Sequence, residues 1–481
     1  MLPTIATGNV SSALAGEYEV ANSCRFDRAS SSKLSKSISS SGNRKTWTWS
    51  AWIKRGNLPG ATADLFGTPY TSLAKGSLYF DTSERLYYSQ YESGGASNNV
   101  GIRTNRVFRD TSAWFHICLI WDTTNSTGDD RIRLYINGTR ETDLGVNTNP
   151  SLNIDGVINN SSHDLLVAGD SSYASLFFDG YMCEVVFIDG QALLPDNFGE
   201  FDSDSPNIWK PKDVSDLTFG TNGFYLDFED SSALGNDVSG NNNDFTVNNL
   251  TSVDQSTDTC TNNFATYNPL QVQVGAANEP IFREGNLNIH GSSTGSIHFH
   301  APSTIGVTQG KWYAEFKGGS SSNENGLVGV TYDPGEDARN DDYPGQQSHS
   351  YGYFVNGNKY TGDSGTSYGD AWTTDIIGVA LDLDNHKLYF SKNGVFQDSG
   401  DPTSGSTGTG AAFSLTTGKT YFFATGDGNA TYINPFEANF GGTQSFTISS
   451  GNTDANGHGN FEYAVPSGYF ALCTKNLSEF G

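Results

Sequence analysis

Short runs in which apolar and polar residues alternate recur along the chain. Thr46–Lys54 (TWTWSAWIK) places Trp47 and Trp49 on one face, and after a local shift Trp52 and Ile53 also reach a face that a sheet could bury. Alternation with a period of two is typical of a half-buried β-strand. Aromatic residues this dense favour a core strand.

Further strands follow in the first half of the chain. Phe115–Asp122 (FHICLIWD) and Arg131–Gly138 (RIRLYING) form a pair, and an Asn-Gly turn closes the second run as a hairpin. Gly180–Gly190 (GYMCEVVFIDG) is the last clear strand of this unit. The pattern predicts an antiparallel sandwich over residues 21–200.

A second set of strands begins near Asn286. Its members alternate in the same way and are expected at Lys311–Lys317, Gly326–Tyr332, Ser350–Val355, Asp375–Gly394 and Thr420–Ala424. Residues 201–275 are rich in Asp, Asn and Ser and predict a connector, and residues 1–20 show no periodicity and predict an N-terminal arm. The fold class is therefore all-β, with two tandem antiparallel β-sandwiches at residues 21–200 and 276–481.

The formal net charge of −26 changes the list of expected partners. Binding to nucleic acid requires clustered Lys and Arg that displace counterions from phosphates, so we expect no DNA or RNA partner. The first residues lack the basic start and the apolar stretch of a secretory signal, and the chain has no run of 18 apolar residues. We therefore expect no signal peptide and no membrane insertion.

The five cysteines, Cys24, Cys118, Cys183, Cys260 and Cys473, lie far apart without CxxC spacing. This spacing indicates neither a zinc site nor a disulfide framework. Three of them lie in apolar runs, where a reduced cysteine behaves as a small hydrophobic residue. The pattern fits synthesis in a reducing cytoplasm.

The first set of strands resembles a laminin-G-like, concanavalin-A-type jelly roll. The resemblance is carried by Trp121 and Asp122, by Ile132–Gly138 and by Asp179–Leu193 (DGYMCEVVFIDGQAL). Two segments, Asp179–Asp202 and Thr221–Leu270, look like a block found in structural proteins of tailed bacteriophages. This resemblance implies a virion protein that assembles with other virion proteins and forms a homo-oligomer, commonly a trimer.

The second set resembles a SPRY domain. The residues that carry this resemblance are Gly310–Phe316 (GKWYAEF), Tyr351–Phe354 (YGYF), Ile377–Gly394 (IGVALDLDNHKLYFSKNG) and the closing Phe470–Leu477 (FALCTKNL). Both families are mainly non-catalytic, and their ligands are set by loops at the rim of the sandwich. Tyrosines such as those of Leu86–Tyr91 (LYYSQY) and Tyr351–Tyr353 could stack on sugars.

Two kinds of metal site fit the sequence. The acidic loop with Asp122, Asp129 and Asp130, and a second loop at Asp337–Asp342, offer the oxygen ligands that calcium prefers, although Asp is common in turns for other reasons. His298 and His300 (HFH) share a strand face with metal-ligand spacing, and a trimer would bring six imidazoles together. The alternative for the histidines is an ordinary strand with Phe299 buried.

Asp382 and Asp384 provide the strongest indication of an enzyme, since two carboxyl groups on one strand face could serve a glycosidase. Because Leu381 and Leu383 would point into the core, an ordinary solvent-facing strand explains the pair better. The sequence has no laminarinase-type ExDxxE strand around Glu184. We expect no enzymatic activity, no catalytic residue and no cofactor beyond calcium.

The sequence therefore predicts a non-catalytic virion structural protein of a tailed phage, either a tail fibre or adhesin or a head decoration protein, that binds virion proteins and host-surface glycan. A secreted, lectin-like carbohydrate-binding protein of a bacterium is the alternative. A glycan-degrading depolymerase is a third candidate, which requires paired carboxylates in a cleft.

Overall fold

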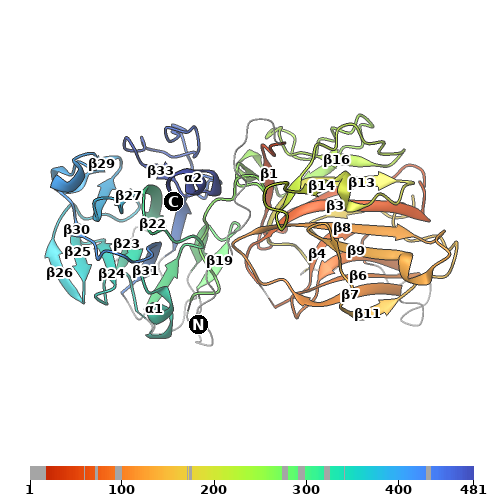
Figure 1. Ribbon diagram of the computed structural model, residues 1–481, viewed down its shortest axis with the longest axis horizontal. Helices are drawn as coiled ribbons and strands as arrows, with labels where there is room; N and C mark the ends of the chain where they lie inside the picture. The colour runs from red at the N-terminus through yellow and green to blue at the C-terminus, as the bar shows by residue number, and fades with distance from the viewer. Residues whose placement is uncertain are drawn as a thin grey trace. The chain divides into compact units, whose positions relative to one another are not determined.

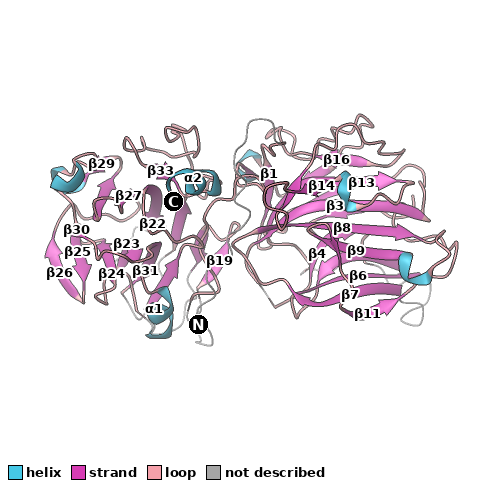
Figure 2. Ribbon diagram, in the orientation of Figure 1, coloured by secondary structure: helices cyan, strands magenta, loops and turns pink. Residues whose placement is uncertain are grey.

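The structure is a computed structural model. It describes residues 18–58, 60–70, 74–92, 100–170, 172, 176–272, 280–290, 298–318, 325–340, 342–428 and 435–481. Nearly all of the N-terminal arm expected at residues 1–20 lies outside these ranges. The described chain divides into two compact units, one that extends to Thr261 and one that begins at Asn262. Both consist of antiparallel sheets, which confirms the all-β fold class with tandem β-sandwiches (Figures 1 and 2).

The first unit contains two eight-stranded sheets. The strands of one sheet are, in spatial order, β10 (Thr139–Arg140), β9 (Ile132–Ile136), β8 (Trp114–Asp122), β3 (Thr46–Arg55), β13 (Gly180–Asp189), β1 (Ser23–Phe26) and β18 (Gln255–Ser256), with β16 (Phe224–Leu226) also on β13. Those of the other are β11 (Leu144–Thr148), β7 (Val100–Val107), β6 (Arg85–Glu92), β5 (Ala74–Phe80), β4 (Ala63–Gly67), β12 (Leu165–Val167), β2 (Lys33–Lys36) and β17 (Thr246–Asn248).

Aromatic side chains from both sheets form the core of this unit. Trp49 of β3 stacks on Phe66 of β4, with ring centroids 5.6 Å apart. Trp47, Trp49 and Ile53 lie in this one core, so the alternation continues through β3 without the expected local shift. Trp52 points to the opposite face, where it is buried in a separate cluster with Trp209 and Cys260.

The hairpin predicted at Asn137–Gly138 is confirmed. β9 pairs with β10 across this turn, and the two residues have φ values of 47° and 73°. Positive φ at both central positions is the geometry that Asn-Gly favours in a tight hairpin. A Cβ on Gly138 would lie 2.3 Å from the ring of Trp209, so a close packing contact adds to the conformational need for glycine.

The connector predicted at residues 201–275 is divided between the two units, with residues 201–261 in the first and the described residues from Asn262 onward in the second. β16 pairs with β13, β17 with β2 and β18 with β1, so residues 201–261 supply strands to both sheets of the first unit. A small two-stranded sheet, β14 (Gly199–Phe201) with β15 (Trp209–Pro211), precedes them. Each of these strands is only two or three residues long, so alternation could not reveal them in a segment of polar composition.

The second unit also has two sheets. One has the order β19 (Ile281–Arg283), β20 (Asn288–His290), β32 (Phe436–Asn439), β22 (Lys311–Gly318), β27 (Ile376–Asp382), β28 (Lys387–Lys392) and β29 (Val395–Phe396), with β30 (Phe413–Ser414) on β28 and β33 (Phe470–Ala471) parallel to β22. The other has the order β21 (Phe299–Pro302), β31 (Phe422–Asp427), β23 (Gly326–Thr331), β24 (Ser350–Phe354), β25 (Asn358–Thr361) and β26 (Ser364–Ser367).

Two short helices accompany the sheets of the second unit, α1 (Pro334–Asn340) and α2 (Thr474–Phe480) (Figure 2). Phe316 of β22 and Phe423 of β31 meet in the core, with centroids 6.2 Å apart. All five cysteines are buried free thiols. Within the described ranges, no helix is long and apolar enough to span a membrane.

Candidate ligand-binding face

The sheet with β5 and β6 presents a set of tyrosines on the side away from the core. Leu78 and Tyr88 form a cross-strand pair that points inward, so the neighbouring pairs point outward. The residues on this side of the sheet, here called the tyrosine face, are Asp64, Lys75, Ser77, Tyr79, Tyr87, Ser89, Tyr91 and Arg103. Asp64, Lys75 and Ser77 are buried, so the accessible part of this face is formed by the tyrosines, Ser89 and Arg103. The sequence analysis identified the tyrosines of Leu86–Tyr91 but not their partners on β5.

Aromatic and cationic contacts hold the tyrosine face together. Tyr79 and Tyr87 are directly opposite each other, with ring centroids 5.3 Å apart. The Lys75 ammonium lies 4.8 Å from the centroid of Tyr79, and the Arg103 guanidinium carbon lies 5.7 Å from that of Tyr87. The Tyr79 hydroxyl lies 3.3 Å from the Ser89 hydroxyl. Both rings are half-buried, so part of each remains accessible to a ligand.

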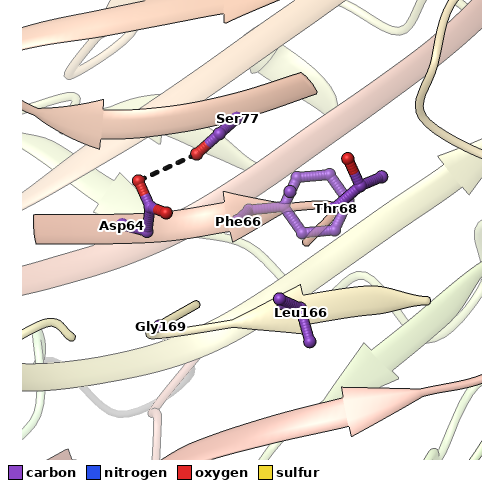
Figure 3. A pocket seen from close by; sticks show the side chains of 7 residues that line it. Asp64, Phe66, Thr68, Ser77, Leu166 and Gly169 are labelled. Atoms are coloured by element: carbon purple, nitrogen blue, oxygen red, sulfur yellow. Dashed lines mark hydrogen bonds between the residues drawn. The ribbon is translucent and has the colours of Figure 1, made fainter. Parts of the chain in front are cut away.

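A buried carboxyl group lies at one end of the tyrosine face. Ser77 Oγ donates a hydrogen bond of 2.9 Å to Asp64 Oδ1 (Figure 3). The Lys75 ammonium is 3.6 Å from the same oxygen. Burial raises the pKa of Asp64 to about 6, although Lys75 and Ser77 oppose this shift. The hollow around Asp64, next to Leu166 and Gly169, leaves no room for a water molecule. Asp64 therefore orders Ser77 and Lys75 and does not contact a ligand directly.

The acidic residues proposed for calcium each have a local partner. Asp122 Oδ1 accepts from the Thr124 amide and hydroxyl, Asp129 Oδ1 accepts from Asn149, and Asp130 pairs with Arg140 at 2.8 Å. Among the residues that the structure describes, no group of three or more His, Cys, Asp or Glu side chains is arranged to hold a metal ion. Calcium binding thus stays a prediction without support from this geometry.

The two histidines of the HFH motif have different surroundings. His298 packs edge-on against Tyr343, with centroids 5.1 Å apart. His300, on β21, is buried and lies 3.9 Å from Asp337 of α1. His349 Nε2 is within 2.7 Å of the other oxygen of the same carboxyl group. His300 thus belongs to a buried His-Asp-His cluster within one chain, and metal binding by His298 and His300 remains untested.

The charges of this cluster follow from its geometry. Burial lowers the pKa of His300, whereas the hydrogen bond to Asp337 raises the pKa of His349. Burial alone would raise the pKa of Asp337, but the two histidines and the Thr331 hydroxyl outweigh it and the net shift is downward. Burial thus disfavours the charged form of His300, whereas the hydrogen bond to Asp337 favours the charged form of His349. Sequence spacing could not reveal Asp337 or His349, because they approach His300 from other elements.

Asp382 and Asp384 do not form a carboxyl pair in a cleft. Asp382 is fully buried, accepts hydrogen bonds from Asn385 and lies 3.1 Å from the Lys311 ammonium. Asp384 is exposed and accepts from the amide of Gly310. Leu383 is buried, as expected, but Asp382 is not solvent-facing as the sequence analysis assumed. The two carboxyl groups fix the turn after β27.

Glu184 is a further buried carboxyl group, placed at an irregularity of β13. The register against β3 shifts between Cys183 and Val186, and Glu184 has a φ of 52°. The hydroxyls of Tyr18 and Tyr225 donate to it at 3.0 and 2.9 Å. Burial raises its pKa to about 7. The backbone irregularity could not be predicted from alternation, which assigns Glu184 to a regular strand.

Comparisons with known proteins agree with the division into two β-sandwich domains. Residues 28–196 match the family model of the concanavalin A-like lectin/glucanases superfamily, and residues 311–427 match that of the SPRY domain. No curated protein sequence matches the chain. Both families consist typically of non-catalytic binding modules.

Solved structures similar to parts of the chain include the SPRY domain of human HERC1, at 17% identity over 38% of this chain and 99% of that chain with a TM-score of 0.29. A heptameric SAP-like pentraxin from Limulus polyphemus shares 14% identity over 37% of this chain and 80% of that one, with a TM-score of 0.26. The assignment of the two domains rests on the matches to the family models and on the observed sheet topology. The chain thus carries a concanavalin A-like domain followed by a SPRY domain.

Proposed function

We propose that the protein is a non-catalytic structural component of a tailed-bacteriophage virion, and that its tyrosine face binds host-surface glycan. The observation that carries glycan binding is the cross-strand pair of Tyr79 and Tyr87, flanked by Lys75 and Arg103. Aromatic rings stack on the apolar face of a sugar, while hydroxyl and cationic groups around them bind its oxygen atoms. The matched concanavalin A-like family supports a carbohydrate ligand.

The positions of three buried carboxyl groups are compatible with a binding role. A glycosidase requires two carboxyl groups about 5–9.5 Å apart across a substrate cleft. Asp64 is closed off from solvent, Glu184 is buried against two tyrosines, and Asp382 is paired with Lys311. These three carboxyl groups therefore cannot serve as an exposed acid and base on the tyrosine face.

The virion role rests on the resemblance of Asp179–Asp202 and Thr221–Leu270 to structural proteins of tailed phages. It entails synthesis in the host cytoplasm, incorporation into the particle through contacts with other virion proteins, and self-association, with a trimer as the expected state. The net charge of −26 keeps a protein present in many copies dispersed and disfavours contact with the packaged genome.

Antibody labelling of purified virions tests this role. Label confined to the tail supports host recognition, and label over the shell supports decoration of the head. Particles without label, together with the protein free in the culture medium, would overturn the virion role and favour a secreted lectin-like protein. Binding of purified protein to host polysaccharide then tests the tyrosine face separately from location.

A further inference from the structure

A pocket of about 220 Å³ lies beside the connection between β7 and β8 in the first domain. Its buried lining is apolar and comes from Phe108, Trp114 and Ile136. Its exposed lining is mostly polar and includes Arg109 and Asp110. An apolar interior with a few polar groups at the opening is the usual composition of a small-molecule site. None of the lining residues belongs to the tyrosine face.

Hydrogen bonds fix the walls of this pocket. Arg55 donates to the carbonyl of Phe108 at 2.9 Å, and the Trp114 indole donates to Asp258 at 2.9 Å. Asp110 Oδ1 accepts from the Ser112 amide at 2.8 Å and holds the turn between the two strands. A ligand would therefore meet walls that are already ordered, which lowers the entropic cost of binding.

The lining contains two arginines and one aspartate, so its formal charge is +1 in a strongly acidic protein. Within the described part of the chain, Arg109 makes no hydrogen bond or ion pair, and its side chain is exposed. Arg106 is 55% exposed and lies 3.6 Å from Glu141, a distance at which an exposed pair contributes little. A guanidinium group binds a carboxylate through two parallel hydrogen bonds. The pocket thus has charge complementarity to an anion.

Two further groups select a ligand that carries hydroxyls. Asn137 accepts from the amide of His116 through its side-chain oxygen, so its NH₂ group can donate. Asp110 uses Oδ1 for the turn and retains a carboxylate oxygen that can accept. A hydroxyl group both donates and accepts, and it matches this combination. Phe108 and Trp114 complete the lining with an apolar surface for a ring.

We propose that this pocket binds a sugar acid, that is, a hydroxyl-bearing ring with a carboxylate group. Arg109 pairs with the carboxylate, Asn137 and Asp110 bind hydroxyls, and the ring packs over Phe108 and Trp114. This site is distinct from the tyrosine face and does not depend on the glycan bound there.

Isothermal titration of the full-length protein with sodium D-glucuronate tests the site, with D-glucose as the neutral comparison. We expect saturable binding of glucuronate that exceeds glucose binding and weakens as sodium chloride is added. Arg109→Ala should lower the affinity about tenfold or more, which corresponds to one charged hydrogen-bonded pair. Arg109→Lys should bind less tightly than the wild type because an ammonium cannot form the paired hydrogen bonds.

The matched control is Arg339→Ala, which removes an exposed arginine of the second domain that has no partner within the described chain. It should bind glucuronate like the wild type, and so should Tyr79→Ala. Equal affinity of Arg109→Ala and wild type, equal affinity for glucose and glucuronate, or no saturable binding by the wild type would each overturn the proposal.

Discussion

The Lys54 ammonium lies 2.6 Å from a carboxylate oxygen of Asp258, and both side chains are closed off from solvent. The second oxygen of Asp258 accepts from the Trp114 indole. Burial lowers the pKa of Lys54, while Asp258 acts in the opposite direction. This contact joins β3 to a segment that its polar composition assigned to a connector, and it makes that segment part of the first domain.

Removal of this carboxylate should destabilise the first domain. Asp258→Ala removes the carboxylate that faces a buried ammonium, and we expect it to lower the free energy of unfolding by about 3–5 kcal/mol. Urea denaturation of the full chain, followed by tryptophan fluorescence, measures the change. Asp204→Ala is the control, since Asp204 is exposed. A loss for Asp258→Ala no larger than for this control would contradict the assignment.

The tyrosine face should be sensitive to single substitutions. Tyr79→Ala and Tyr87→Ala each remove one member of the stacked pair, and we expect each to weaken binding to purified host polysaccharide by about fivefold or more. Biolayer interferometry with immobilised polysaccharide measures the change. Tyr463→Ala, which alters a half-buried tyrosine of the second domain, should bind like the wild type. Undiminished binding by both Tyr79→Ala and Tyr87→Ala would place the glycan elsewhere.

Glu184 predicts a pH-dependent stability. Its pKa rises on folding from 4.5 to about 7, so its favourable contribution is complete below pH 4.5 and is lost as the pH rises through about 7. Glu184→Gln cannot ionise. Its free energy of unfolding relative to wild type should therefore improve by about 3 kcal/mol between about pH 4.5 and about pH 8. Denaturation across this range should show no such trend for the exposed control Glu200→Gln.

Substitution of two glycines distinguishes the cost of backbone strain from the cost of a steric clash. Gly138 and Gly240 both have positive φ, but a Cβ would collide with Trp209 only at Gly138 and has open space at Gly240. Gly240→Ala should cost about 1–2 kcal/mol through backbone strain alone. Gly138→Ala should cost clearly more, because Trp209 must also move. Thermal unfolding of both variants compares the two costs, and equal values would show that the indole adapts freely.

Local pattern predicted the strands but not their long-range partners. The runs that became β3, β8, β22 and β27 were identified because alternation and Asn-Gly turns are encoded by adjacent residues. Asp258 contacts Lys54, 204 residues away in sequence. Tyr79 meets Tyr87 and His349 meets Asp337 over shorter separations, but these contacts depend on strand register and on the position of α1, which alternation does not encode. The shortest strands carry too few residues for a period to appear. For this reason the edge strands and the partners of these tyrosines on β5 could be identified only from the structure.

The late strands of the first domain have a consequence during synthesis. β17 pairs with β2 and β18 with β1, across more than half of the domain's sequence. Until residues 246–256 leave the ribosome, β1 and β2 each lack one neighbour and expose unpaired amide and carbonyl groups. Such open edges recruit other chains, so a nascent protein paused before this point is vulnerable to aggregation. Release of these two short strands completes the pairing of β1 and β2, and the edges of the two sheets then lie at β17 and β18, which are only three and two residues long.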